Sequence, residues 1–295
     1  MSTTDATHIR DRMHSGHYSA RSATIRKHTV SAIHALLIAI AVFVAVFPLF
    51  WVLLGSFKLP ADVMRLPPVL FFEPTLANYI WVLGDRFGFF FENSVVITGG
   101  SVSLTLLVSL PAAYGLSRLR IPFKRTIMLL ILAVRFVPYI VFALPLFLIL
   151  SEAGMIGSRP AMVFVYIIIN LPVVIWLMRA FFDDIPIELD ESAALDGASR
   201  FRTFLSIILP CSGPGVATVT ILSFIFAWNE YLFALILSGR DSQTLTVGIT
   251  RFLGGMEEGI RWGQLSAWAI AIVAPVVLVS MLLNRHLRRG FTGPM

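Results

Sequence analysis

The chain has 295 residues, of which 57% are hydrophobic and only 14% are charged, whereas soluble domains carry about 25% charged residues. This composition excludes an ordinary soluble domain and indicates a membrane protein. The formal net charge of +6 does not indicate nucleic-acid binding, because the Lys and Arg residues lie in tails and loops beside apolar runs. The single cysteine, Cys211, excludes an internal disulfide and a cysteine-based zinc cluster.

The first segment, residues 1–29, is polar and rich in Ser, Thr, His and Arg, and we expect it to form an N-terminal tail. Its histidines are spaced irregularly, which does not favour a metal site: His8, His14, His17 and His28. The apolar run that follows begins near Ser31 and is longer than the apolar core of a cleavable signal, about 7–15 residues. Residues 30–295 are therefore predicted to form one membrane domain.

Long apolar stretches predict an all-α membrane protein with about six transmembrane helices. A hydrocarbon core about 30 Å thick needs about 20 helical residues to cross it. The predicted spans are residues 31–56, 94–116, 126–150, 161–178, 215–237 and 267–283.

Lys and Arg residues set the expected orientation. They are concentrated in the N-terminal tail, at the C-terminus and in the loops after the second and fourth spans. We therefore expect both termini, and the polar segment of residues 187–210, to face the cytoplasm.

Motifs for hydrolytic chemistry are missing from the sequence. It contains no G-x-x-x-x-G-K-[ST] phosphate loop, no H-E-x-x-H zinc motif and no G-x-S-x-G nucleophile motif. We therefore expect a transport protein rather than an enzyme, driven by an ion gradient or by another subunit.

The polar segment reads as two short helices. Pro186 suits a first helical turn, which Asp183 or Asp184 could cap, and acidic residues follow where the helix dipole favours them. Ala193 and Ala194 would keep the helix surface flat for close approach of another protein, and Gly197 can adopt the left-handed conformation that ends a helix.

The second helix is expected from about Ser199, with an apolar face of Phe201, Phe204, Ile207 and Ile208 that packs under the membrane domain. Two interpretations fit the whole segment. It is either a docking surface for a partner or an ordinary helical hairpin at the membrane interface.

A sequence pattern favours the docking surface. The segment resembles the EAA loop of ATP-binding-cassette importer permeases, whose pattern is E-A-A, three residues, G, nine residues, then I-x-L-P. The matching residues are Glu191, Ala193, Gly197, Ile207, Leu209 and Pro210. Ser192 stands where the pattern prefers Ala, but Ser is also small.

Further stretches are similar to the carbohydrate, maltose-transporter-like branch of these permeases. They are residues 93–94, 170–172, 226–230, 244–248 and 262–263, and the likeness runs from about Val30 to the C-terminus. The resemblance implies the type I importer permease fold and import of a sugar or sugar-like solute across a bacterial inner membrane.

The resemblance also implies partners and a coupling site. A second permease subunit would form a heterodimer with this chain in the membrane lipid, and two ATPase subunits would bind ATP and Mg²⁺, with no cofactor in this chain. An extracytoplasmic binding protein would contact the outer loops at residues 57–93 and 238–266, although their aromatic residues also fit a membrane-interface belt. The coupling-helix loop is expected at about residues 183–210, with these contact residues: Glu191, Ser192, Ala193, Asp196 and Gly197.

Polar residues inside the spans are candidates for the solute pathway: Arg135, Tyr139, Asn170, Trp228, Asn229 and Glu230. A buried charge in a bilayer faces the protein interior or a water-filled cavity. Arg135 could bind the solute, pair with Glu230 or pair with the second permease. The prolines Pro138, Pro145 and Pro172 could kink the spans.

Two other classes of protein remain as alternatives. A stand-alone secondary transporter would need inverted repeats and paired intramembrane acids, and the sequence shows neither. An intramembrane enzyme would need a catalytic pair, but His34 is the only histidine deep in a predicted span. The solute is left open among oligosaccharides, monosaccharides, polyols, glycerol phosphates and acidic sugars.

Overall fold

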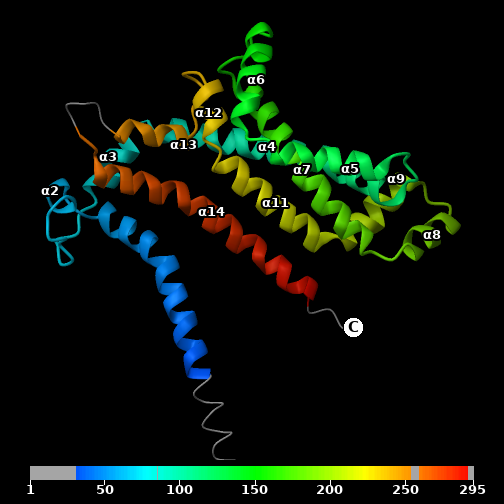
Figure 1. Cartoon of the computed structure of the whole chain (residues 1–295), viewed down its shortest axis with the longest axis horizontal. Coiled ribbons are helices and arrows are strands. Elements are labelled where there is room, and N and C mark those ends of the chain that lie inside the picture. The colour runs from blue at the N-terminus through cyan, green and yellow to red at the C-terminus, as the bar shows by residue number, and fades with distance from the viewer. Residues whose placement is uncertain (1–30, 85, 254–258, 292–295) are drawn as a thin grey trace, which may run out of the picture. The chain divides into compact units, whose positions relative to one another are not determined.

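The structure is a computed structural model that describes residues 31–84, 86–253 and 259–291, and the predicted tail of residues 1–29 lies outside these ranges. The chain divides into two compact units, residues 1–54 and residues 55–295. The first unit contributes most of the helix Ser31–Ser56, which is the first span at its predicted bounds. The described residues are nearly all helical, and their only β-bridge joins Gly157 and Ser238, so the all-α prediction is confirmed (Figure 1).

The second unit contains helices of very different lengths. Its α-helices are α2 (Pro60–Val63), α3 (Ala77–Gly84), α4 (Phe87–Arg118), α5 (Lys124–Ala133), α6 (Ile140–Glu152), α7 (Arg159–Asp183), α8 (Glu188–Leu195), α9 (Arg200–Thr203), α10 (Leu209–Cys211), α11 (Gly213–Trp228), α12 (Leu232–Leu237), α13 (Leu245–Gly248) and α14 (Trp262–Phe291). Two 3₁₀ turns, η1 (Val134–Phe136) and η3 (Ile249–Phe252), and a π-helical turn, η2 (Phe204–Ile208), complete it.

The helices long and apolar enough to cross a bilayer agree with the predicted number of spans. The described residues contain four such helices, or up to six if two bent pairs each count as one span. The second, fourth and sixth predicted spans correspond to α4, α7 and α14, and each helix starts before the predicted residue and ends after it.

The third and fifth predicted spans are not continuous helices. In the third span, the segment from Lys124 to Phe136 meets α6 at 97°. The fifth span, residues 215–237, is interrupted where α11 ends at Trp228 and resumes as α12, and the 80° bend between Arg200–Cys211 and α11 lies before its predicted start. In the third span Val137, which precedes Pro138, is extended with φ −78° and ψ 128°. A residue before proline is pushed out of the helical region, so the bend follows from the sequence at this point.

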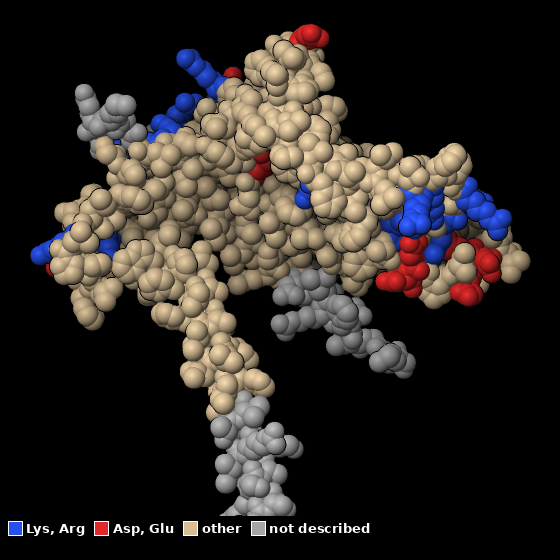
Figure 2. Space-filling view, in the orientation of Figure 1, with Lys and Arg blue, Asp and Glu red and all other residues tan. Residues whose placement is uncertain are grey.

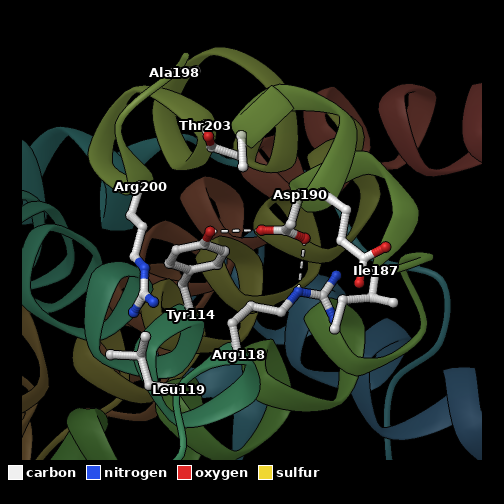
Figure 3. A pocket seen from close by; sticks show the side chains of 10 residues that line it. Tyr114, Arg118, Leu119, Ile187, Asp190, Ala198, Arg200 and Thr203 are labelled. Carbon is white, nitrogen blue, oxygen red and sulfur yellow. Dashed lines mark hydrogen bonds and ion pairs between the residues drawn. The ribbon is translucent and has the colours of Figure 1, made fainter. Parts of the chain in front are cut away.

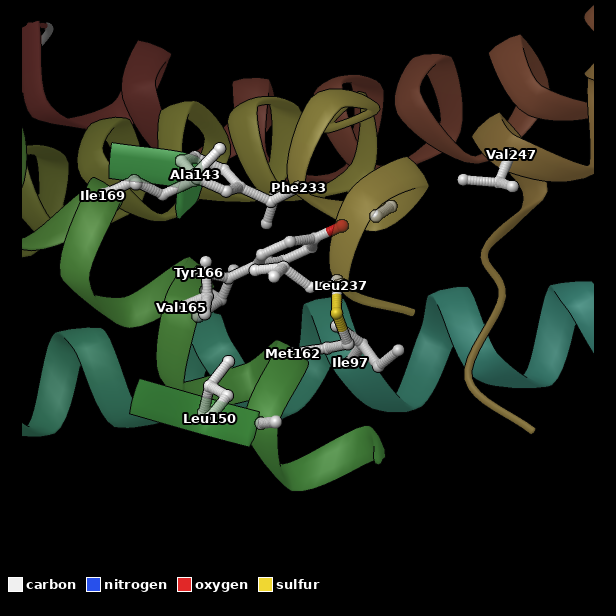
Figure 4. Packing of buried hydrophobic residues seen from close by; sticks show 14 residues of the cluster. Ile97, Ala143, Leu150, Met162, Val165, Tyr166, Ile169, Phe233, Leu237 and Val247 are labelled. Atoms are coloured by element: carbon white, nitrogen blue, oxygen red, sulfur yellow. The ribbon is translucent and has the colours of Figure 1, made fainter. Parts of the chain in front are cut away.

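The core of the second unit is built around the pair α4 and α7, which make its most extensive helix contact. Small polar side chains on α4 are fully buried along one face: Thr98, Ser101, Thr105 and Ser109. Small residues allow helix backbones to approach closely in membranes. Beside them, Tyr166, Met162, Phe233 and Leu237 form the central apolar cluster (Figure 4).

Candidate functional site

The polar segment forms helix α8 at the end of the second unit away from α3 (Figure 1). This is also the end at which α4 and α7 finish and α9 begins. Acidic and basic side chains gather there (Figure 2). The loops after the second and fourth spans, which the distribution of Lys and Arg places on the same side of the membrane, are therefore neighbours in the fold.

The start of α8 differs from the prediction. The helix begins at Glu188, after Pro186, and its N-terminal neighbour Ile187 offers no side-chain cap. Asp183 instead ends α7, where its carboxylate accepts a hydrogen bond from Ser117 at 2.5 Å and lies 3.3 Å from the Arg179 guanidinium. These contacts occupy Asp183, one of the two carboxylates that could have capped α8, and no side chain caps the helix.

The end of α8 agrees with the prediction for Gly197, whose φ is +77°. The Ala198 N–H donates to the carbonyl of Ala193 at 2.9 Å, and the Gly197 N–H donates to the carbonyl of Ala194 at 3.1 Å. These two bonds form the Schellman motif, which satisfies carbonyls at a helix end and needs a left-handed residue.

Gly197→Ala tests this helix end. Open space surrounds the added methyl group, so its effect is backbone strain of about 1–2 kcal/mol in the left-handed region. We expect faster hydrogen exchange at the amides of Gly197 and Ala198. Gly213→Ala, which also meets no neighbour but is helical, is the control and should leave exchange in the α8 loop unchanged. Equal exchange in both variants would contradict the prediction.

Helix α8 has one exposed face and one that points into the protein. Exposed positions follow at i, i+3, i+4 and i+7: Glu188, Glu191, Ser192 and Leu195. Leu195 has 89% of its surface exposed, although it is apolar. Asp190 and Ala193 face inward, and Ala193 is only 4% exposed.

This division corrects one part of the prediction. Ala194 lies on the surface as expected, but Ala193 packs inside, because it is three positions after the inward-facing Asp190. Asp196 and Gly197 are exposed just after the helix. An exposed stripe of acidic, small and apolar side chains is suited to contact another protein.

The second helix of the segment begins as predicted. Ser199 caps α9 by accepting a hydrogen bond from the Arg202 N–H at 3.3 Å. Phe204 and Ile208 are buried, but Phe201 is 68% exposed, so the expected apolar face is only partly used. The π-helical turn η2 begins at Phe204 and changes the rotation per residue, which separates Phe201 from the buried face.

Three side chains that join α8 to α4 were not predicted (Figure 3). The Tyr114 hydroxyl donates to Asp190 Oδ1 at 2.6 Å, and Arg118 Nε lies 3.0 Å from Asp190 Oδ2. The other end of the Arg118 guanidinium donates to the Ile185 carbonyl at 2.7 Å. A cavity of about 220 Å³ lies beside them, lined also by Arg200 and Thr203. The i, i+4 spacing of Tyr114 and Arg118 was the available signal, but it did not identify their partner.

Within the membrane region, Arg135 lies at the bend between α5 and α6. It donates to the Tyr139 hydroxyl and, at 3.2 Å, to the Ile169 carbonyl, and its guanidinium lies 5.1 Å from the Phe226 ring centroid. Arg135 and Tyr139 line a small, mostly apolar cavity of about 70 Å³. Among the described residues Arg135 makes no ion pair with an acidic side chain.

The pairing of Arg135 with Glu230, one of the three alternatives that the sequence left open, does not form in the structure. The Glu230 carboxylate is buried and accepts hydrogen bonds from the N–H groups of Phe233 and Ala234 at 2.9 and 3.0 Å. It therefore holds the first turn of α12, because those amides have no partner within the helix. Arg135 instead donates to the Tyr139 hydroxyl and the Ile169 carbonyl.

The remaining pathway candidates have separate environments. Asn170 is buried and donates to the Tyr166 carbonyl one turn earlier, at 2.9 Å. Trp228 is buried and donates to the Ile272 carbonyl of α14 at 2.9 Å, so it packs between helices. Asn229 is exposed and donates to the Ile225 carbonyl at 2.9 Å. The structure therefore brings together Arg135 and Tyr139, but not all six candidates.

Metal binding has no candidate in the described ranges, where no three His, Cys, Asp or Glu side chains are grouped to hold an ion. The histidines of the tail lie outside those ranges.

Comparisons with known proteins agree on one family. The family described as binding-protein-dependent transport system inner membrane component matches residues 105–293. The sulfoquinovosyl glycerol transport system permease protein SmoH of Agrobacterium fabrum is 33% identical, over 84% of this chain and 87% of that protein. The trehalose/maltose transport system permease protein MalG of Thermococcus litoralis is 32% identical, over 91% of this chain and 96% of the relative.

Solved structures show the same fold. A chain of a bacterial ABC transporter that imports the acidic polysaccharide alginate aligns with a TM-score of 0.73 and 24% identity, over 88% of this chain and 96% of that chain. The predicted resemblance and the importer permease fold are thereby confirmed.

Proposed function

Because the chain belongs to the family of binding-protein-dependent transport system inner membrane components, we propose that it moves a sugar or sugar-like solute into the cytoplasm. Members of this family are the non-catalytic membrane subunits of ATP-driven importers. The relatives named for trehalose and maltose and for sulfoquinovosyl glycerol support a carbohydrate as the solute. The single observation that carries the proposal is the exposed stripe on α8, within the matched region.

The proposed assembly contains a second permease subunit, two ATPase subunits that hold ATP and Mg²⁺, and an extracytoplasmic solute-binding protein. This chain would span a bacterial inner membrane through residues 30–295, with the tail of residues 1–29, the C-terminus and the loop of residues 183–210 in the cytoplasm. A chain of a solved bacterial alginate ABC transporter, in complex with an alginate pentasaccharide-bound periplasmic protein, has the same fold with a TM-score of 0.67, which supports the binding protein as a partner.

The coupling site in this proposal is the exposed stripe of α8 together with Asp196 and Gly197. Glu191 forms a charge-assisted contact with a basic group of the ATPase. Leu195 fills an apolar depression there, and Ser192 is small enough to permit close approach. Closure of the ATPase pair on ATP would displace α8 and rock the spans from inward-open to outward-open, a rigid-body change.

The solute pathway is proposed to pass Arg135 and Tyr139, which line a cavity at a bent span. Asn229, three residues after the Phe226 whose ring lies beside the Arg135 guanidinium, is exposed and can offer its amide to a hydroxyl group. Asn170, Trp228 and Glu230 fix the walls through their backbone contacts.

Arg135→Gln is expected to reduce solute uptake about tenfold or more, because hydrogen bonds to a charged group contribute about 1.5–3 kcal/mol. The measurement is initial uptake rate against solute concentration, normalised to the amount of assembled complex. Arg135→Lys should retain part of the activity, since the charge remains. Arg125→Gln, which changes an exposed arginine on α5 outside the loop of residues 183–210, is the control. Normal uptake by Arg135→Gln would assign Arg135 a structural role.

The proposed function is tested by uptake into proteoliposomes that contain the complete assembly. Labelled trehalose, maltose and sulfoquinovosyl glycerol are offered with and without internal ATP. We expect uptake of a carbohydrate only when ATP, the ATPase and the binding protein are all present. Uptake driven by an ion gradient, without the ATPase, would replace the proposal by the secondary transporter.

A further inference from the structure

The inward face of α8 carries a single acidic side chain, Asp190, and both of its carboxylate oxygens are engaged by α4. Oδ1 accepts the hydrogen bond of the Tyr114 hydroxyl at 2.6 Å, and Oδ2 lies 3.0 Å from Arg118 Nε. The side chains of Asp190 and Arg118 are only 16% and 11% exposed. An ion pair from which water is largely excluded is screened much less than a surface pair.

The two partners on α4 are themselves fixed. The ring of Tyr114 packs against Phe204 with centroids 5.0 Å apart and against Phe182 at 6.0 Å. The guanidinium of Arg118 also donates to the Ile185 carbonyl, which lies between α7 and α8. Tyr114 and Arg118 are one turn apart, so both side chains project from the same face of the last turns of α4. Asp190 is therefore bound by two side chains, Tyr114 and Arg118, whose own positions are fixed by packing and hydrogen bonding.

Helix α4 can transmit a displacement over a long distance. It has 32 residues and packs along α7, with which it makes the main helix pair of the core. A load applied to its cytoplasmic end therefore reaches the membrane-spanning region through a rigid element. The loop after Leu195 connects α8 to α9, which continues through η2 and α10 to Cys211.

We propose that Tyr114, Arg118 and Asp190 form a latch that makes α8 and α4 move as one body during transport. Asp190 is a positioning residue: it does not touch the ATPase or the solute, but keeps the exposed stripe of α8 in register with α4. This inference rests on the proposed docking of α8 to an ATPase. The inference gives the inward face of α8, which points away from the ATPase, the function of joining α8 to α4.

The first test compares Asp190→Asn and Tyr114→Phe with Asp184→Asn. Asp184 is an exposed acid in the same loop and is the control for charge. Tyr114→Phe removes the hydroxyl but leaves the aromatic contacts that support folding. All variants should still co-purify with the ATPase, because the exposed stripe is unchanged. We expect the ratio of solute-stimulated to basal ATP hydrolysis to fall about tenfold in Asp190→Asn, a change equivalent to about 1.4 kcal/mol, and less in Tyr114→Phe. Wild-type stimulation in Asp190→Asn would overturn the latch.

A crosslink distinguishes a moving unit from a contact that merely stabilises the fold. In a Cys211→Ser background, the pair Arg118→Cys and Asp190→Cys removes the latch and supplies two thiols for a short bifunctional reagent. If α8 and α4 move as one body, crosslinking restores the lost stimulation and transport. Loss of the residual transport on crosslinking would show that the two helices must separate, and would refute the latch.

The latch and the proposed docking fail in distinguishable ways. Variants of the exposed stripe should lose the ATPase itself, whereas latch variants should keep it and lose stimulation. If stripe variants assemble normally, the docking proposal fails whatever the latch variants do.

Discussion

Glu191→Ala combined with Leu195→Asp is expected to abolish binding of the ATPase to this chain. The first change removes the charged side chain that we propose to contact the ATPase, and the second places a carboxylate at Leu195, an apolar side chain that is 89% exposed and that the proposed partner would cover. Central contact residues of interfaces contribute about 2 kcal/mol or more each. Together they should weaken the complex by more than about a hundredfold, at about 1.4 kcal/mol for each factor of ten.

The measurement is the amount of ATPase that co-purifies with the tagged permease in mild detergent. The control is Glu152→Ala, which removes an exposed acid from the last residue of α6, outside the candidate loop. Solute uptake should be lost with the ATPase in the double variant and retained in the control. Normal co-purification of the double variant would exclude α8 as the docking element.

Gly248→Ala is expected to destabilise the folded chain strongly. A β-carbon at this position would lie 2.5 Å from a ring carbon of Trp268 and 3.1 Å from one of Phe90. Trp268 cannot move away easily, because it is fully buried and its Nε1–H donates to the Leu245 carbonyl at 2.8 Å. Forcing extra volume into a well-packed core costs about 1–3 kcal/mol.

Thermal unfolding of the purified chain in detergent measures this effect. Gly99→Ala is the matched control, because its β-carbon on α4 meets no atom within 4 Å. The melting temperature should fall clearly for Gly248→Ala and stay equal or rise for Gly99→Ala, since Ala is the better helix former. Equal melting temperatures would contradict the packing described around Trp268.

The spanning helices were predictable because their signal is compositional. Apolar runs of sufficient length identify α4, α7 and α14 without any knowledge of their neighbours. The bend at Val137 was within reach of the sequence, since Pro138 was recognised as a kink site. Its size of 97° depends on how α5 and α6 pack, which a local pattern does not determine.

The proposed coupling loop, residues 183–210, was also only partly predictable. The pattern of Glu191 and Gly197 fixed the position of α8, and the left-handed φ of Gly197 followed from its place after a helical run. The orientation of α8 about its own axis could not be predicted from this pattern, so Ala193 was assigned to the exposed face although it packs inside. The contact of Tyr114 with Asp190 joins residues 76 positions apart, and only the fold brings them together.

The intramembrane polar residues could be identified from the sequence, but their partners could not. A bond between Arg135 and Glu230 was one of three alternatives for Arg135, suggested by opposite charges deep in two spans. The structure satisfies Glu230 with two backbone amides instead, because an interrupted span exposes N–H groups at the start of α12. A helix break leaves backbone N–H and C=O groups free to pair with polar side chains. A prediction that considers only side chains misses these partners.

The docking of α8 to an ATPase is tested by ATP hydrolysis of the reconstituted assembly, measured with and without the solute-loaded binding protein. We expect strong stimulation in the wild type and in Glu152→Ala, and none in the variant with Glu191→Ala and Leu195→Asp. Full stimulation of that double variant, or solute transport by this chain without any ATPase, would contradict this docking.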